Sequence, residues 1–87
     1  MRILKYEVLL EGTFSIEMPN DGVILSMQVQ HNIPYIWVQV GSNMKLNKRN
    51  FRILTTGEAF DIISSKERYI GTFQLNVGSF VGHLFEL

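Results

Sequence analysis

Residues 23–40, VILSMQVQHNIPYIWVQV, decide the fold of this chain. Two runs in which apolar and polar residues alternate lie on either side of a short break, His31-Asn32-Ile33-Pro34. Alternation with a period of two is typical of a strand with one buried face, and two such runs across a tight break predict a β-hairpin. We place the turn at Asn32-Ile33. Opposite residues of a hairpin share a face, and the predicted pairs are Gln30 with Tyr35, Gln28 with Trp37 and Ser26 with Gln39.

This register divides the hairpin into two faces. One face is apolar and is expected to lie in the core; its residues are Leu25, Met27, Val29, Ile36, Val38 and Val40. The other face mixes amides with two large aromatic side chains; its residues are Ser26, Gln28, Gln30, Tyr35, Trp37 and Gln39. This second face is too aromatic for an ordinary wet surface and too polar for a core. We therefore expect it to contact another part of the chain, a second subunit or a ligand.

Alternating segments continue on both sides of the hairpin. Residues 2–10, RILKYEVLL, are expected to form a strand whose inward, even-numbered residues are Leu4, Tyr6, Val8 and Leu10. Further strands are predicted at residues 13–18, 51–56, 69–76 and 80–86. Residues 41–50 have no period and are expected to form a mobile loop. Residues 58–68 fit either a short strand or one helical turn, followed by a loop.

These segments amount to about seven short strands, spaced at intervals typical of all-β domains and joined by tight turns. The pattern predicts an all-β fold, a small antiparallel sandwich or a partly open barrel. A length of 87 residues is enough for one domain, so residues 1–87 are expected to form a single β domain. A domain this small is marginally stable alone, and contact between subunits would stabilise it.

The composition argues against several classes of function. Eight basic residues balance eight acidic ones, whereas a duplex nucleic-acid binder usually carries a basic excess, so nucleic-acid binding is not expected. The absence of cysteine removes disulfides, thiolate metal sites and thiol catalysis. No apolar run approaches the length of about 18 residues that spans a bilayer. Lys5 and Glu7 interrupt the apolar N-terminal run, which does not read as a signal peptide. We therefore expect a cytoplasmic protein without membrane contact.

No pattern typical of an enzyme or of a metal site is found. The two histidines, His31 beside a turn and His83 in the last strand, have no ligand spacing with a carboxylate, and no glycine fits a phosphate-binding loop. We expect no catalytic residue, no metal and no cofactor. His83 alternates with apolar residues and is expected to be half-buried with one hydrogen bond. Gly71 and Gly82 lie inside predicted strands, where a glycine often marks a bulge, a bend or a close approach of backbone or ligand.

The amides and aromatics of the hairpin suit a small, flat, anionic ligand. Trp37 and Tyr35 offer surfaces for stacking on a nucleobase, and glutamine amides both donate to and accept from base edges. Arg52 lies in the middle of a predicted strand, where a charged side chain needs a partner, either a neighbouring carboxylate or an anion across an interface. Its guanidinium group suits phosphate. The predicted ligand-binding residues are Gln28, Gln30, Tyr35, Trp37, Lys48, Arg49 and Arg52. Alternatively, the two aromatics pack against another strand or a second subunit, and the basic residues are simply solvated.

Three segments resemble a family of small phage and prophage proteins: LSMQVQHNIPYIWVQV (25–40), RYIGTFQL (68–75) and GHLFEL (82–87). Members of that family read as a Met-Pro turn, LSVQVQ, an aromatic-rich strand, IGTFQL and an aromatic-acidic end, in the same order. The chain length also resembles that of a small early-region protein of T-even phages. One corner differs, because Thr56-Gly57 is followed by Glu58-Ala59 where the family has a histidine and a proline. No ligand role is carried over to that corner.

The resemblance implies a role in phage counter-defence. Proteins of this T-even group sequester the cyclic-nucleotide signal of bacterial CBASS immunity, bind it without cleaving it and form oligomers. On this basis we expect a non-enzymatic protein of the host bacterial cytoplasm. It would bind a cyclic dinucleotide such as 3′,3′-cGAMP in pockets at the subunit interfaces of a homo-oligomer. Two alternatives stay open: a protein–protein interaction module that inhibits a host enzyme, and a single-strand nucleic-acid binder, which the neutral net charge disfavours.

Overall fold

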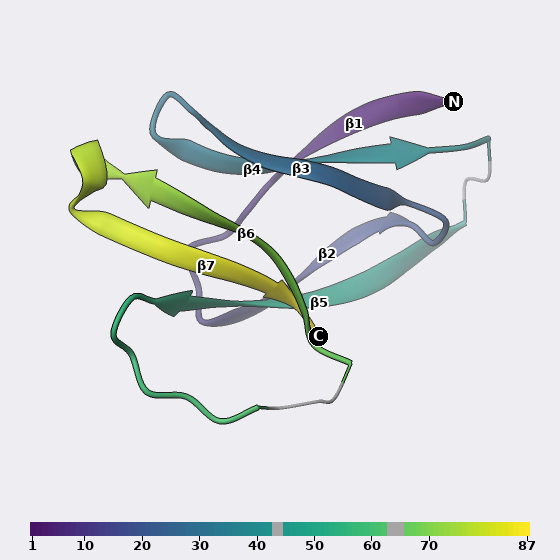
Figure 1. Cartoon of the computed structure of the whole chain (residues 1–87). Coiled ribbons are helices and arrows are strands. Elements are labelled where there is room, and N and C mark those ends of the chain that lie inside the picture. Colours follow the sequence, from purple (N-terminus) through teal and green to yellow (C-terminus); the bar gives the residue numbers. More distant parts are fainter. Residues whose placement is uncertain (43–44, 63–65) are drawn as a thin grey trace.

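A computed structural model describes residues 1–42, 45–62 and 66–87. The elements in chain order are β1 (Arg2–Glu7), β2 (Thr13–Pro19), β3 (Val23–Gln30), β4 (Ile33–Val40), β5 (Leu46–Thr55), β6 (Arg68–Leu75), the 3-10 turn η1 (Asn76–Gly78) and β7 (Phe80–Glu86). They form a three-stranded sheet of order β1-β4-β3 and a four-stranded sheet of order β2-β5-β7-β6, both antiparallel (Figure 1). The predicted all-β sandwich of seven strands is confirmed. The described part of the chain contains no helix that could cross a membrane.

The two sheets meet along β3 and β6, which lie side by side without forming a hydrogen-bonded ladder. Both strands carry an irregularity: β3 shifts register between Ile24 and Ser26, and β6 between Tyr69 and Gly71. Bulges of this kind twist an edge away from regular pairing, which explains why the sheets do not join here. The result is a rolled, open sandwich with β1 and β2 as its outermost strands.

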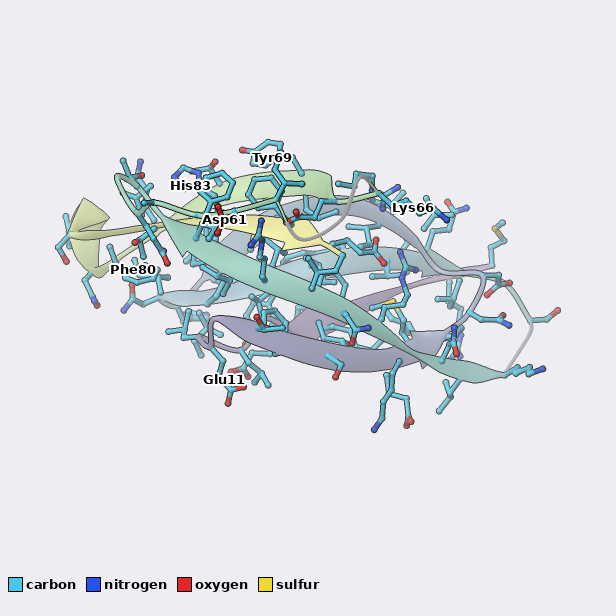
Figure 2. All side chains as sticks on the ribbon, turned by 90° about the horizontal axis from the view of Figure 1, so that it is seen from below. Glu11, Asp61, Lys66, Tyr69, Phe80 and His83 are labelled. Atoms are coloured by element: carbon cyan, nitrogen blue, oxygen red, sulfur yellow. The ribbon has the colours of Figure 1, made fainter. Side chains whose placement is uncertain are left out.

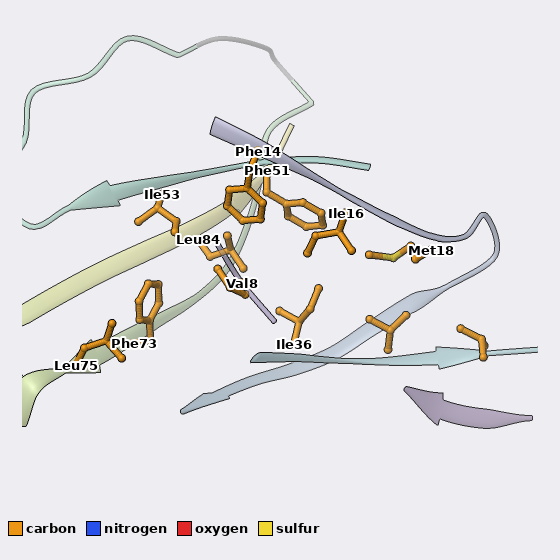
Figure 3. Packing of buried hydrophobic residues seen from close by; sticks show 12 residues of the cluster. Val8, Phe14, Ile16, Met18, Ile36, Phe51, Ile53, Phe73, Leu75 and Leu84 are labelled. Atoms are coloured by element: carbon orange, nitrogen blue, oxygen red, sulfur yellow. The ribbon is translucent and has the colours of Figure 1, made fainter. Parts of the chain in front are cut away.

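A single apolar cluster fills the space between the sheets (Figure 3). Alternate residues of β2, β4, β5, β6 and β7 point into it, as the period of two predicts. Phe14 and Phe51 stack at its centre with ring centroids 5.6 Å apart. Ile36, Val38 and Leu84 are fully buried. The apolar face of the central hairpin therefore supplies one wall of the core.

The hairpin is confirmed, but its predicted register is wrong by two residues. His31 and Asn32, with φ of 52° and 63°, form the turn instead of Asn32-Ile33. A two-residue hairpin turn of this type requires positive φ at both positions, which asparagine tolerates well. Gln28 consequently lies opposite Tyr35, and Ser26 lies opposite Trp37. An even shift keeps the side chains from Ser26 to Val40 on their predicted faces, so the division into two faces is retained there.

Two apolar residues expected in the core lie at the surface. Leu25 is the extra residue of the β3 bulge and is 48% exposed. Ile24 takes its place against the core. Leu10 is 59% exposed because β1 ends at Glu7 and the chain then crosses to the other sheet. Sequence alternation alone predicted neither the bulge nor the early end of the strand.

The expected loop at residues 41–50 is also wrong in its second half, because β5 begins at Leu46. Lys48 lies opposite Glu17 on β2 in a continuous antiparallel ladder. Arg49 occupies a partly buried position at which a regular alternation would have an apolar residue. The sequence therefore shows no period of two in the first half of β5, and the strand was not predicted there. Among the described residues of the segment 58–68, those at 58–62, 66 and 67 form neither strand nor helix. Arg68 begins β6, and residues 63–65, Ile63 among them, lie outside the described part.

Two hairpin ends are tied together at one end of the sandwich. The side chain of Asn32 donates to Oδ1 of Asn76 at 2.8 Å and accepts from the backbone N–H of Asn76 at 2.7 Å. The next residue, Val77, has φ of 56° and a fully exposed side chain. A β-branched residue in the left-handed region is strained, and Val77 buries nothing in return.

We expect Val77→Asn to raise the free energy of unfolding by about 1 kcal/mol, since asparagine adopts the left-handed conformation at lower cost. Urea denaturation followed by circular dichroism measures the change. Val77→Thr, which is equally branched, serves as the control and should not stabilise. An Asn variant no more stable than the Thr variant would contradict the expected strain.

Candidate functional site

The mixed face of the hairpin forms the outer surface of the three-stranded sheet. We call this surface the amide–aromatic face; its residues are Lys5, Ser26, Gln28, Gln30, Tyr35, Trp37 and Gln39. Tyr35 and Trp37 lie on the central strand β4, and both are half-buried between flanking side chains. Their ring centroids are 6.0 Å apart and the ring planes meet at 75°. The sheet thus presents two aromatic rings on a broad outer surface.

Lys5 extends across this face, although it was not among the predicted ligand-binding residues. Its Nζ lies 4.4 Å from the centroid of the Tyr35 ring and donates to Oε1 of Gln30 at 3.1 Å. Lys5 comes from β1, where it is paired with Trp37. The outward position of Lys5 was visible in the alternation of residues 2–10. Its proximity to Tyr35 depends on the pairing of β1 with β4, which no local pattern encodes.

A shallow hollow continues the amide–aromatic face toward the start of β1. It has a volume of about 400 Å³ and is lined by Met1, Arg2, Ile3 and Gln39. Arg2 is exposed there. Lys5 therefore provides positive charge beside the aromatic rings, where Lys48, Arg49 and Arg52 were predicted, whereas Arg2 is paired with the buried Val40 and belongs to the other face of β1.

Those three predicted basic residues lie on the other sheet, in β5. Lys48 is exposed on its outer surface opposite Glu17. Arg49 and Arg52 are each held by a carboxylate of the chain, Glu86 and Glu67. The structure thus brings Gln28, Gln30, Tyr35 and Trp37 together on one sheet. It does not bring them together with the predicted basic residues.

Arg49 joins three parts of the chain. Its Nε donates to Glu86 Oε2 at 2.6 Å, its Nη2 to Glu86 Oε1 at 2.9 Å and its Nη1 to the carbonyl of Gly22 at 2.5 Å. The hydrogen bonds that Arg49 donates to Glu86 raise the pKa of Arg49 above its ordinary value, against the opposite effect of partial burial. Glu86 also accepts from Arg68 at 3.1 Å. Arg49 therefore serves the fold, and a phosphate would have to displace Glu86 to reach it.

Arg52 is buried on the outer side of the four-stranded sheet, beneath the connection between β5 and β6. Its side chain is only 8% exposed, and its Nε lies 2.5 Å from Oε1 of Glu67, which is equally buried. Neither atom makes a directed hydrogen bond, so the contact is an ion pair. Nη2 of Arg52 donates to the carbonyl of Asp61 at 3.0 Å, and the guanidinium carbon lies 5.3 Å from the centroid of Phe60. The charge expected to bind phosphate instead fixes the loop.

This loop and the outer side of the four-stranded sheet enclose a second candidate site. We call it the His83 cavity; it has a volume of about 230 Å³ and is lined by Leu54, Thr55, Thr56, Gly57, Glu58, Phe60, Tyr69, His83 and Phe85. Figure 2 shows Tyr69, His83 and Asp61 grouped on one side of the molecule, away from Glu11. The cavity lies on the outer side of the four-stranded sheet, and the amide–aromatic face lies on the outer side of the three-stranded sheet.

His83 is half-buried, as predicted, but it has two hydrogen-bonding partners where one was expected. Nε2 lies 2.7 Å from Oγ1 of Thr56, and Nδ1 lies 2.9 Å from Oγ1 of Thr72. Thr72 also contacts the hydroxyl of Tyr69. A hydroxyl beside an imidazole resembles a nucleophile with its base, but a hydroxyl, not a carboxylate, orients this ring. This arrangement explains the orientation of His83 and of the cavity wall.

Glu58 places a carboxylate at the rim of the His83 cavity. Its Oε1 accepts from the backbone N–H of Thr55 at 2.8 Å and from the Thr55 hydroxyl at 3.1 Å. These hydrogen bonds lower the pKa of Glu58 below its ordinary value, so the group is ionised at neutral pH. In residues 1–42, 45–62 and 66–87, no three His, Asp or Glu side chains gather to form a possible metal site.

The fold and these two surfaces define a small, open β-sandwich with one candidate binding surface on each sheet. The chain belongs to the family described as Domain of unknown function (DUF7352), whose model matches residues 1–87. No curated protein and no solved structure matches it significantly. The family assignment therefore leaves the function to be argued from the side chains.

Proposed function

We propose that this protein binds a cyclic dinucleotide on the amide–aromatic face and holds it without cleaving it. The observation that carries the proposal is the outward-facing, half-buried ring pair Tyr35–Trp37 with the ammonium group of Lys5 at 4.4 Å from the Tyr35 centroid. Flat rings stack on nucleobases, glutamine amides read base edges, and a nearby cation attracts phosphate. Lys5 replaces Lys48, Arg49 and Arg52 as the proposed phosphate contact.

The proposal includes a two-fold dimer formed through β1. β1 is hydrogen-bonded to β4 on one side and is the outermost strand of its sheet on the other. Such an edge is a ready template for a strand of a second copy. With Leu4 on the two-fold axis, Arg2 lies opposite Tyr6 and Ile3 opposite Lys5. With Lys5 on the axis, two ammonium groups would face each other, which disfavours that register.

Dimerisation would give the site the symmetry of its ligand. A two-fold axis perpendicular to the sheet keeps both amide–aromatic faces on the same side. The two β4 strands would be three strand spacings apart, about 14 Å. The two Lys5 side chains would lie between the two ring pairs, where the two phosphates of a cyclic dinucleotide could bind. A role in counter-defence within the host cytoplasm follows from the resemblance to phage proteins and is part of the same proposal.

Isothermal titration calorimetry with 3′,3′-cGAMP tests the proposal. We expect binding at micromolar concentration with one ligand per two protomers, and release of unmodified ligand when the complex is heated. Trp37→Ala should weaken binding about 10- to 100-fold, as the loss of one stacked base predicts. Tyr69→Ala, which removes an exposed aromatic ring from the other sheet, is the matched control and should bind normally. A folded protein that gives no heat, or that loses affinity only in the control variant, would refute the site.

A second candidate function is an interaction module that inhibits a host enzyme. It is favoured by the apolar residues around the same sheet, since Ile3, Val23 and Leu25 are all about half exposed. In that case Trp37→Ala would abolish capture of a host protein. Neither the unmodified protein nor the Trp37→Ala variant would give heat on titration with the nucleotide. The calorimetric experiment therefore separates the two functions.

A further inference from the structure

The His83 cavity combines three aromatic walls with one ionised carboxylate. Tyr69 and Phe85 come from neighbouring strands, with ring centroids 5.5 Å apart and planes meeting at 61°, so they form a corner. Phe60 lines the same cavity from the loop between β5 and β6. Phe60 and Tyr69 are each more than half exposed, although large aromatic side chains usually bury more of their surface. The exposed rings therefore line a cavity that is open to a ligand.

The charges around the cavity favour a cation. Glu67 neutralises Arg52, which fixes Phe60 through its contact with the ring. Glu58 is then the ionised group at the rim, and the exposed Asp61 follows one residue after Phe60. The side-chain groups of His83, Thr56 and Thr72 are hydrogen-bonded to one another. Aromatic rings with a nearby carboxylate are the usual means of recognising alkylated ammonium groups.

We propose that the His83 cavity binds a small alkylammonium group, which packs against Phe60, Tyr69 and Phe85 and has Glu58 as its counter-charge. The volume of about 230 Å³ corresponds to that of roughly eight water molecules at about 30 Å³ each. A trimethylammonium group with a short chain fits this space. The site lies on the opposite sheet from the amide–aromatic face, so it does not depend on cyclic dinucleotide binding.

NMR titration of the ¹⁵N-labelled protein with choline tests the proposal. Its neutral isostere, 3,3-dimethyl-1-butanol, is the reference ligand, and sodium chloride matches the ionic strength. We expect amide shifts centred on residues 55–60, 69 and 83–85, and choline affinity at least about fivefold above that of the isostere. Glu58→Gln should reduce the ratio of the choline affinity to the isostere affinity toward one. Trp37→Ala should titrate like the unmodified protein, which separates this site from the proposed nucleotide site.

Two substitutions at Tyr69 distinguish ring recognition from simple apolar contact. Tyr69→Phe keeps the ring and should bind choline normally, whereas Tyr69→Leu keeps apolar contact with Phe85 and should bind about fivefold more weakly. A parallel titration with acetyl-trimethyllysine amide distinguishes the two possible sources of the alkylammonium group. Tighter binding of this probe indicates a modified protein side chain, whereas tighter binding of choline indicates a free metabolite. Equal affinity for choline and its isostere, or no shifts at the cavity in a folded protein, would overturn the proposal.

Discussion

Glu67→Gln should lower the free energy of unfolding by about 3 kcal/mol, because it leaves the buried charge of Arg52 without its counter-charge. Both side chains of this pair are only 8% exposed. The pair lies on the outer side of the sheet, yet the loop removes it from water. Urea denaturation measures the loss of stability.

The double variant Arg52→Met/Glu67→Met provides the decisive comparison. Replacing both partners of a buried ion pair by apolar side chains is often neutral or stabilising, so the double variant should be much more stable than Glu67→Gln alone. Arg68→Ala breaks an exposed ion pair with Glu86 and should cost less than about 1 kcal/mol. If Glu67→Gln costs no more than Arg68→Ala, the pair is not buried in solution.

Gly82→Ala should destabilise the fold by about 2–3 kcal/mol through overpacking. Gly82 is buried on β7 directly opposite Phe73 on β6. A Cβ atom at this position would lie 2.6 Å from Cζ of Phe73, a ring that is only 3% exposed and cannot move aside. The glycine inside this strand therefore marks the close approach of an aromatic ring.

Phe73→Leu should partly rescue Gly82→Ala, because leucine lacks the ring atoms that the new methyl group would meet. A double-mutant cycle by urea denaturation should give a favourable coupling of at least about 1 kcal/mol. Gly12→Ala is the matched control, since no atom lies within 4 Å of its added Cβ. Additive effects of the two core substitutions, or equal losses for Gly82→Ala and Gly12→Ala, would contradict the close contact.

The candidate site was predicted only in part. The four hairpin residues, Gln28 and Gln30 on one strand and Tyr35 and Trp37 on the other, share a face as expected. Arg52 was correctly expected to need a partner of opposite charge, but that partner is Glu67 in the covering loop. No local pattern indicates that pairing, because the two residues are brought together by the path of the loop.

The sequence by itself determined the class of fold and the orientation of most side chains. Successive side chains of a strand point to opposite faces, so apolar residues at every second position indicate the buried face. This pattern does not depend on which strand lies alongside. The tertiary structure decided the rest: the turn at His31-Asn32, the bulge that exposes Leu25, the strand that contains Arg49 and the His83 cavity. These features depend on contacts between segments far apart in the chain, and such contacts leave no local period in the residues that make them.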